Sequence, residues 1–148
     1  MEQHRLLLGT IGLFGWLFSP LALAADSFEG PVVAHVERVV DGDTIEVRAE
    51  IWLAQSLIVR VRIDGVDAPE MKARCPLERA RAEAARDYLE RRIGNADVRL
   101  TDVVYDKYGG RVRAAVADER GDIGEALLRT GLARAYHGGH RDGWCGGA

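Results

Sequence analysis

VVDGDTIEV at residues 39–47 and RIDGVDAPE at residues 62–70 are the two segments that decide how this chain folds. In each, an Asp-Gly pair follows a run of apolar residues, which is the pattern of a strand ending in a tight turn. Asp43, Asp67, Glu70 and Arg62 lie at these predicted strand ends. We expect the strands to pair near their ends, which brings the four side chains together.

These four side chains suit the binding of a hard cation beside a phosphate. Carboxylate oxygens are the ligands that such a cation prefers, and a guanidinium binds phosphate as a bidentate fork. A third carboxylate can take a proton from an attacking water. Simpler roles are also open, because Asp often bonds its own backbone in an exposed turn, while Arg62 and Glu70 could be ordinary solvated side chains.

The rest of the chain supplies a small barrel. Alternating apolar residues predict strands at residues 32–40, 45–53, 57–63, 98–105 and 112–117. A helix is expected from Pro76 to Ile93, stopped by Gly94, and a second one from a capping-box-like start at Asp122 to Gly131. Five strands with a helix between the third and fourth, followed by a C-terminal helix, predict the OB-fold, an α+β barrel.

The first 24 residues differ from the rest. Arg5 precedes the apolar run Leu6–Phe18, and Ala22-Leu23-Ala24 is a small-x-small cleavage signature. We expect a signal peptide at residues 1–24 and one mature domain at residues 25–148, with a glycine-rich tail from 137 to 148. Export to the periplasm or the exterior would follow. The alternative is an uncleaved membrane anchor, since the run approaches the length of a spanning helix if extended through Pro20.

Two cysteines, Cys75 and Cys145, complete the composition. An even count in an exported chain predicts a disulfide between them, and two separate thiols are the alternative. The formal charge of −3 shows no strongly basic surface. Any attraction to nucleic acid would therefore be local rather than long-range.

Four motifs stand in one order along the chain: DGDT at residues 41–44, R-x-x-x-x-D-A-P-E at 62–70, DKYGGR at 106–111 and EALLRTGLARAY at 125–136. Together they resemble the staphylococcal nuclease (thermonuclease) family. The resemblance implies the same OB-fold and a Ca²⁺-dependent nuclease that cuts DNA and RNA with little sequence preference, leaving 3′-phosphates. A monomer with no stable membrane association after signal cleavage is expected.

The resemblance also assigns roles to residues. It makes Asp43 and Asp67 ligands of Ca²⁺, joined by the backbone carbonyl of Ala68. It makes Glu70 the general base and Arg62 a phosphate-binding residue. The remaining site residues that it implies are Arg111 as a second phosphate-binding arginine, and Lys107, Tyr108 and Tyr136 as nucleotide contacts.

Arg111 departs from the family pattern. In the best-known members the second arginine directly follows the turn glycine, whereas Gly109-Gly110 precedes Arg111 here. A one-residue slip turns a strand side chain to the opposite face. We expect a glycine bulge to absorb the extra residue and restore the direction of Arg111.

Three other interpretations remain at this point. A non-catalytic nucleic-acid-binding OB module would keep the barrel but need no carboxylates. An exported interaction protein would use the barrel as a scaffold alone. In the tail, His137, His140 and Cys145 offer the ligand types of a zinc or copper site, although a solvated tail is the simpler explanation.

Overall fold

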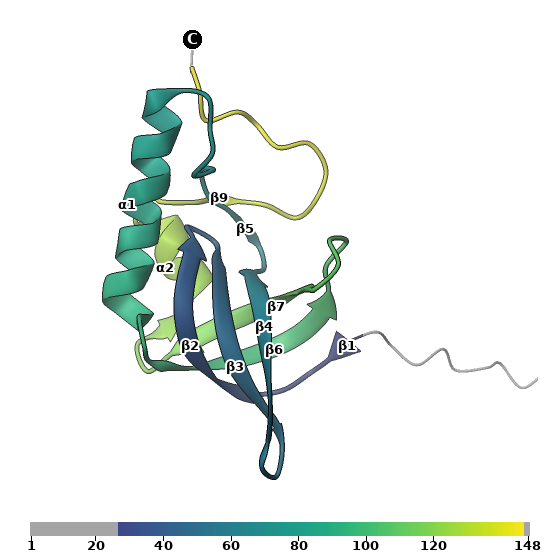
Figure 1. Ribbon diagram of the computed structural model, residues 1–148. Coiled ribbons are helices and arrows are strands. Elements are labelled where there is room, and N and C mark those ends of the chain that lie inside the picture. Colours follow the sequence, from purple (N-terminus) through teal and green to yellow (C-terminus); the bar gives the residue numbers. More distant parts are fainter. Residues whose placement is uncertain (1–26, 147–148) are drawn as a thin grey trace, which may run out of the picture.

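Five strands close into a barrel in the computed structural model, which describes residues 27–146 (Figure 1). The order around the barrel is β6-β2-β3-β4-β7, and a further pairing between β6 and β7 closes it. The pairing of β4 with β7 is parallel and the others are antiparallel. The barrel strands are β2 (Val32–Asp41), β3 (Thr44–Trp52), β4 (Gln55–Ile63), β6 (Asp97–Tyr105) and β7 (Arg111–Asp118). The predicted OB-fold with two helices is confirmed.

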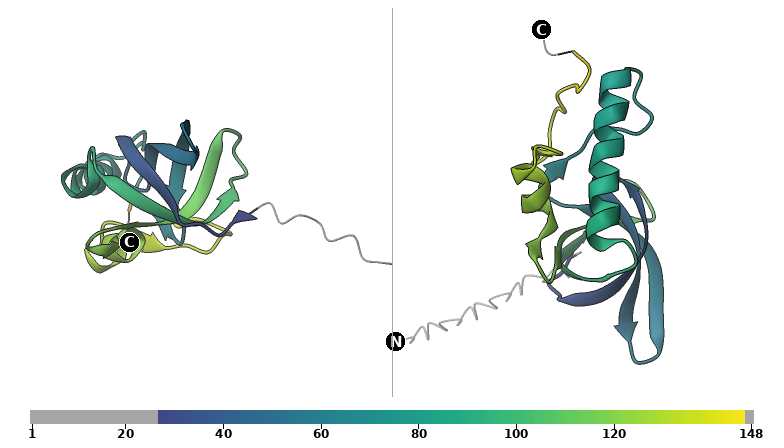
Figure 2. Two further views of the ribbon diagram at one scale, coloured as in Figure 1. Left: turned by 90° about the horizontal axis from the view of Figure 1, so that it is seen from below. Right: turned by 90° about the vertical axis from the view of Figure 1, so that its left-hand side faces the viewer.

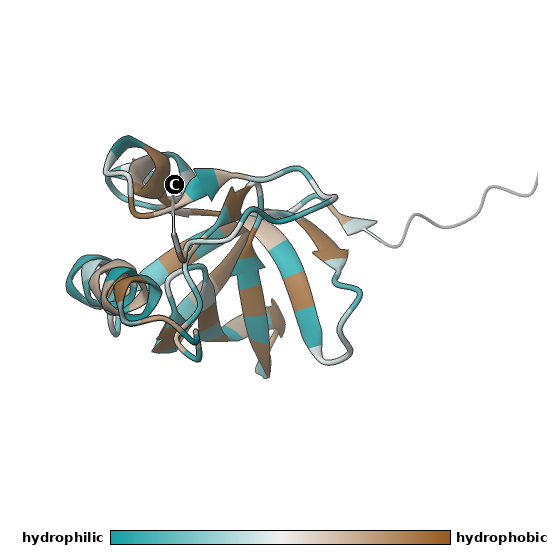
Figure 3. Cartoon of the chain, turned by 90° about the horizontal axis from the view of Figure 1, so that it is seen from above, coloured by the Kyte–Doolittle hydropathy of each residue, from teal (hydrophilic) through white to brown (hydrophobic). Residues whose placement is uncertain are grey.

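Apolar side chains that alternate along the strands fill the barrel. Figure 3 shows this as alternating hydrophobic and hydrophilic bands. Val36, Ile45, Val47 and Val61 are fully buried in the core. Their neighbours along each strand face outward, as the period of two requires.

One part of the predicted pattern is wrong. Ile51, Leu53 and Leu57 continue the apolar alternation of β3 and β4, yet they are 55, 84 and 52% exposed. The reason is length, because the β3–β4 hairpin runs beyond the barrel (Figure 1) and has no opposite strands to cover it.

Helix α1 (Pro76–Ile93) packs along one side of the barrel beside β2 (Figure 2). Pro76 begins it, as predicted, and the Cys75 sulfur accepts a hydrogen bond from the Glu78 amide at 3.4 Å. The β2–β3 turn lies tight against this helix: a Cβ on Gly42 would come within 2.6 Å of the Ala85 Cβ. The glycine of the DGDT segment therefore allows this close approach.

The second helix leads the chain back to the same end of the barrel. After β8 (Gly121–Asp122), α2 (Ile123–Arg129) starts where Asp122 accepts a 2.7 Å hydrogen bond from the Glu125 amide, as the capping pattern predicts. The segment that follows forms β9 (Arg134–Ala135), which pairs with β5 (Val66–Asp67). The two-residue β1 (Ser27–Phe28) pairs with β6 at the opposite end of the barrel.

The predicted signal peptide at residues 1–24 lies outside the described residues. Within residues 27–146, no helix has both the length and the apolar character needed to cross a membrane.

Candidate active site

Asp43 sits in the turn between β2 and β3, where the sequence predicts it. It is only 6% exposed, so the alternative of an ordinary residue in an exposed turn is wrong. Three hydrogen bonds within the protein take the place of those that an exposed carboxylate makes to water. Thr44 Oγ1 donates to Oδ1 at 2.9 Å, while Arg62 Nη2 and the Ala68 amide donate to Oδ2 at 3.0 and 3.2 Å. A buried carboxylate needs such partners to remain charged.

Arg62 joins this carboxylate to the next one. It ends β4 on the polar face, and its side chain is only 12% exposed. Its Nη2 lies 3.0 Å from Asp43 Oδ2 and 3.5 Å from Asp67 Oδ1, and it also donates to the Val66 carbonyl at 3.0 Å. One guanidinium nitrogen therefore brings together the two aspartates that are 24 positions apart in the sequence, as predicted.

Asp67 and Glu70 complete what we call the carboxylate cluster (Asp43, Asp67 and Glu70). Asp67 is 5% exposed in β5, whereas the Glu70 side chain is 56% exposed. A tail residue, Arg141, contacts both: it forms an ion pair with Asp67, and its Nη1 lies 2.9 Å from Glu70 Oε1. Trp144 Nε1 lies 3.4 Å from Asp67 Oδ2. The cluster is therefore covered from the C-terminal side.

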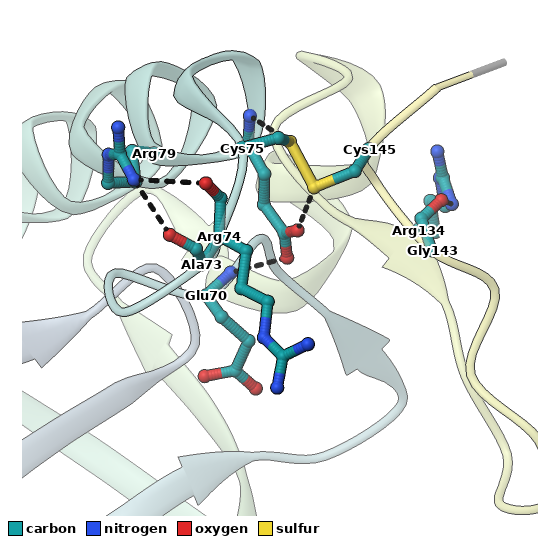
Figure 4. The surroundings of a disulfide bond; sticks show 9 residues. Glu70, Ala73, Arg74, Cys75, Arg79, Arg134, Gly143 and Cys145 are labelled. Carbon is teal, nitrogen blue, oxygen red and sulfur yellow. Dashed lines mark hydrogen bonds between the residues drawn. A yellow bond between two sulfur atoms is a disulfide. The ribbon is translucent and has the colours of Figure 1, made fainter.

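The predicted disulfide between Cys75 and Cys145 is present, with the Cα atoms 5.8 Å apart. Figure 4 shows it beside the loop that carries Glu70. Four residues before Cys145 stands Arg141, so the bridge holds this arginine near the cluster. Trp144, which is 7% exposed, anchors the tail further, because the Arg134 guanidinium stacks on its ring at 3.7 Å.

Asp41, the first residue of DGDT, has a pKa that is shifted by its surroundings. Burial, together with the negative charge of Asp43, raises the pKa of Asp41 to about 6. Its Oδ1 accepts a hydrogen bond from the Asp43 amide at 3.1 Å, which helps to fix the turn. On the other side of the cluster, burial acts to lower the pKa of the Arg141 guanidinium, but its hydrogen bond to Asp67 and the negative charges of Asp67, Glu70 and Asp43 together raise it.

Arg111 has other partners. Its Nε donates to Asp106 Oδ2 at 2.5 Å, and its guanidinium lies 5.0 Å from the centre of the Tyr108 ring. In the β4–β7 pairing Arg111 is the partner of Arg60, two residues before Arg62, and this register contains no bulge. The expected bulge is therefore wrong: the extra glycine lies in the loop before β7, where Gly110 adopts φ +76°. The expected direction is kept, because the pairing with Arg60 places Arg111 on the sheet face of Arg60 and Arg62.

The predicted nucleotide contacts separate into two groups. Tyr136 lies at the cluster: its amide donates to the Gly65 carbonyl at 2.9 Å, and its ring centre is 5.7 Å from the Arg62 guanidinium carbon. Lys107 and Tyr108 lie in the β6–β7 loop, where the ammonium of Lys107 is 5.1 Å from the Tyr108 ring centre. That loop carries its own small cationic and aromatic group with Arg111.

The donors at the cluster fit a hard cation such as Ca²⁺. Two buried carboxylates meet at one point, and positively charged guanidinium groups already stand against them. The predicted third ligand, Ala68, is buried against Asp43. The carboxylate oxygens are suitable ligands for such a cation, which would compete with these guanidinium groups for them.

A different set of metal-ligand atoms is brought together at Cys75, Glu78 and Cys145, which lie within 4.8 Å of one another in the described part of the chain. The two sulfurs are bonded to each other, so they present no thiolate to a metal. The same bond removes Cys145 from the zinc or copper site considered with His137 and His140.

Arg141 is the site residue that the sequence does not identify. It lies in a glycine-rich tail, 71 positions after Glu70, and belongs to no motif. One signal points to it: Cys145 is four residues away and its predicted partner Cys75 is five residues after Glu70. A bridge between the cysteines places the tail beside the cluster.

A family model described as staphylococcal nuclease homologue matches residues 60–143 of this chain. The match covers the end of β4, both helices and the tail as far as residue 143, and so includes Arg141. No curated protein matches the chain.

Proposed function

Because the chain belongs to the staphylococcal nuclease family, we propose that it is an exported, calcium-dependent nuclease that hydrolyses phosphodiester bonds of DNA and RNA. The observation that carries this proposal is the convergence of Asp43 and Asp67 on one nitrogen of Arg62, with Glu70 beside them. The family alone does not require these side chains to meet in a given member. Their meeting supports catalysis over simple binding.

The residues of the cluster have different roles in the proposed phosphodiester hydrolysis. Asp43 and Asp67, with the Ala68 carbonyl, would hold Ca²⁺, which supplies positive charge next to the phosphate when it is bound. Arg62 is fixed by Asp43 and the Val66 carbonyl, so its guanidinium is oriented before the substrate arrives. It binds a phosphate oxygen and stabilises the charge that develops there.

Glu70 is placed to act on water. Its side chain is exposed, unlike those of the two aspartates, so water reaches its carboxylate. Its amide donates to Glu78 Oε1 at 3.2 Å, which ties the residue to the start of α1. Glu70 accepts the proton of the water that attacks phosphorus.

Two features support the substrate class and the compartment. Cation and arginine act on the phosphate, which every nucleotide of DNA and RNA carries, so low sequence preference is expected. The disulfide suits an oxidising compartment outside the cytoplasm. A signal peptide at residues 1–24 would direct the chain there.

The proposal is tested by incubating the purified protein with single-stranded DNA and RNA, in Ca²⁺ or in excess chelator. We expect fragments only with Ca²⁺, with 3′-phosphate ends. The control is Asp43→Asn, which keeps the size of the side chain but removes its charge and one of its two acceptor oxygens. An oligonucleotide that binds in Ca²⁺ and stays intact would indicate a non-catalytic binding module instead.

A further inference from the structure

We infer that Arg141 is a second phosphate-binding arginine of this site, delivered by the disulfide-anchored tail. The inference rests on the proposed function and goes beyond it, because Arg141 belongs to none of the four motifs. The guanidinium of Arg111 pairs with Asp106 instead of with the carboxylate cluster.

Arg141 stands where a substrate phosphate has to arrive. Its guanidinium spans Asp67 and Glu70, the residues assigned to the cation and to the attacking water. Tyr136 lies close to both arginines of the site: its ring centre is 5.7 Å from the Arg62 guanidinium carbon and 5.8 Å from that of Arg141. The two guanidinium groups thus lie near one ring and contact the same carboxylate, Asp67.

The two arginines differ in exposure. The Arg62 side chain is 12% exposed and that of Arg141 is 37% exposed. Arg62 is thus the fixed, buried cation, while Arg141 presents part of its guanidinium to solvent. A guanidinium has five N–H donors, and Arg141 keeps donors for a phosphate besides those that face Asp67 and Glu70.

Charge balance gives a second argument. With Arg62 and a bound Ca²⁺, the three carboxylates would carry no net charge, so no net attraction for a phosphate would remain. A cation at Asp67 would compete with Arg141 for that carboxylate and would leave the guanidinium at the entrance of the site. Arg141 therefore adds positive charge where an approaching backbone needs it.

The tail is anchored at both ends of the segment that carries Arg141. At one end, the Tyr136 amide bonds the Gly65 carbonyl, and the Tyr136 hydroxyl donates to the Gly139 carbonyl at 3.0 Å. At the other end, Trp144 is buried and Cys145 is bonded to Cys75. These anchors limit the conformations of Arg141 and so reduce the entropy lost when it binds.

The same contacts fit one rival, a tail that blocks the cation site and holds the protein inactive. The two ideas predict opposite effects of removing the guanidinium. If Arg141 binds phosphate, removing its guanidinium weakens ligand binding. If Arg141 blocks the site, removing its guanidinium strengthens both ligand binding and cleavage.

The test uses Arg141→Ala in the full mature protein, with thymidine 3′,5′-bisphosphate as a ligand that contains no bond to cleave. Binding is measured by calorimetry in saturating Ca²⁺, and Ca²⁺ binding is titrated separately. Arg113→Ala is the matched control, because the Arg113 side chain is similarly exposed at 42% and pairs with an aspartate, Asp64, at 2.7 Å.

We expect Arg141→Ala to weaken bisphosphate binding about 10- to 100-fold, the usual effect of lost charge-assisted hydrogen bonds. Its affinity for Ca²⁺ alone should not fall, and Arg113→Ala should change neither. Unchanged or tighter bisphosphate binding by Arg141→Ala would overturn the inference. Wild-type cleavage of single-stranded DNA is measured in parallel, so failure of the proposed function appears as a wild type that does not cut.

Discussion

The two ends of this barrel are built from the same strands and have opposite chemistry. At one end, the end of β2, the start of β3 and the end of β4 carry the carboxylate cluster with Arg62, and the tail covers it (Figure 1). At the other end is an open apolar mouth of about 950 Å³. Its lining includes Phe28, Val33, Ile51, Leu57 and Val103. The right-hand view of Figure 2 shows the tail and the β3–β4 hairpin at opposite ends.

This difference between the two ends indicates which of them suits the hydrolysis of a phosphodiester. A buried charge persists only with partners, so the buried aspartates of the cluster require Arg62, Arg141 and Trp144. The apolar mouth contains a cavity, and the charged residues that line it are Glu50 and Arg111, the latter paired with Asp106. Cavity size alone would select the apolar end, whereas the buried, paired aspartates favour the cluster end as the candidate site.

The largest expected effect separates the two ends. Glu70→Gln should reduce the turnover of single-stranded DNA about 10²–10⁴-fold, because it removes the general base. Binding of a nucleoside bisphosphate in Ca²⁺ should change little. Trp52→Ser, in the exposed hairpin beyond the apolar mouth, is the control and should cut at the wild-type rate. Equal losses of turnover in Glu70→Gln and Trp52→Ser would contradict the assignment of catalysis to the cluster end.

Reducing the disulfide should remove the cover from the cluster end. The bridge closes a loop of 70 positions, and loss of its constraint on the unfolded chain lowers the free energy of unfolding by about 4 kcal/mol. Chemical denaturation with and without reductant measures this. Bisphosphate binding should weaken in the wild type and change much less in Arg141→Ala. A similar loss of bisphosphate affinity in the wild type and in Arg141→Ala would show that the bridge affects binding through the Glu70 loop and not through Arg141.

The next effect compares two arginines on neighbouring strands. Arg62→Ala should reduce turnover about 10²–10³-fold, as the loss of a charge-stabilising donor does. Arg111→Ala should cost less than about tenfold, because Arg111 pairs with Asp106 and lines the apolar mouth. Initial rates of cleavage measure both. A loss for Arg111→Ala as large as that for Arg62→Ala would place Arg111 in the site after all.

The smallest expected effect concerns an ion pair that belongs to neither end. Arg92 on α1 holds Asp118 on β7 at 2.7 and 2.8 Å. Its hydrogen bonds lower the pKa of Asp118 to about 2, from 3.8 in the absence of these contacts. The folded state thus binds the proton less readily than the unfolded chain, so this stability is present above pH 3.8 and is lost as the pH falls through about 2.

Asp118→Asn should therefore lower the free energy of unfolding at pH 7 by about 2–3 kcal/mol, the equivalent of that pKa shift. The wild-type and variant values should approach each other in acid. Urea titrations at pH 7 and pH 3 measure the difference. A difference that grows in acid would contradict the assignment of the pKa shift to Asp118.

Local signals in the sequence were sufficient for most of the fold. The Asp41-Gly42 turn, Pro76 at the start of α1 and the Asp122 cap each act within a few residues, and the structure places all three as expected. The meeting of Asp43 with Asp67 followed from pairing strands that are close in sequence. Such features depend on local geometry, which a sequence records directly.

Other features depend on contacts that the sequence does not record. Leu53 continues an apolar alternation, but only the length of the other strands decides whether it is covered. The burial of Asp43 depends on Arg62 and on the Ala68 amide, which lie 19 and 25 positions later in the chain. Arg141 reaches the site through a disulfide and a buried tryptophan, and no spacing rule connects it to Glu70.

A crystal structure with Ca²⁺ and an uncleavable phosphorothioate oligonucleotide tests most directly whether the charged end of the barrel is the nuclease site. The account predicts a calcium ion about 2.3–2.6 Å from carboxylate oxygens of both Asp43 and Asp67, with a backbone phosphate against Arg62. An oligonucleotide seated in the apolar mouth, or a calcium ion bound away from both aspartates, would contradict it.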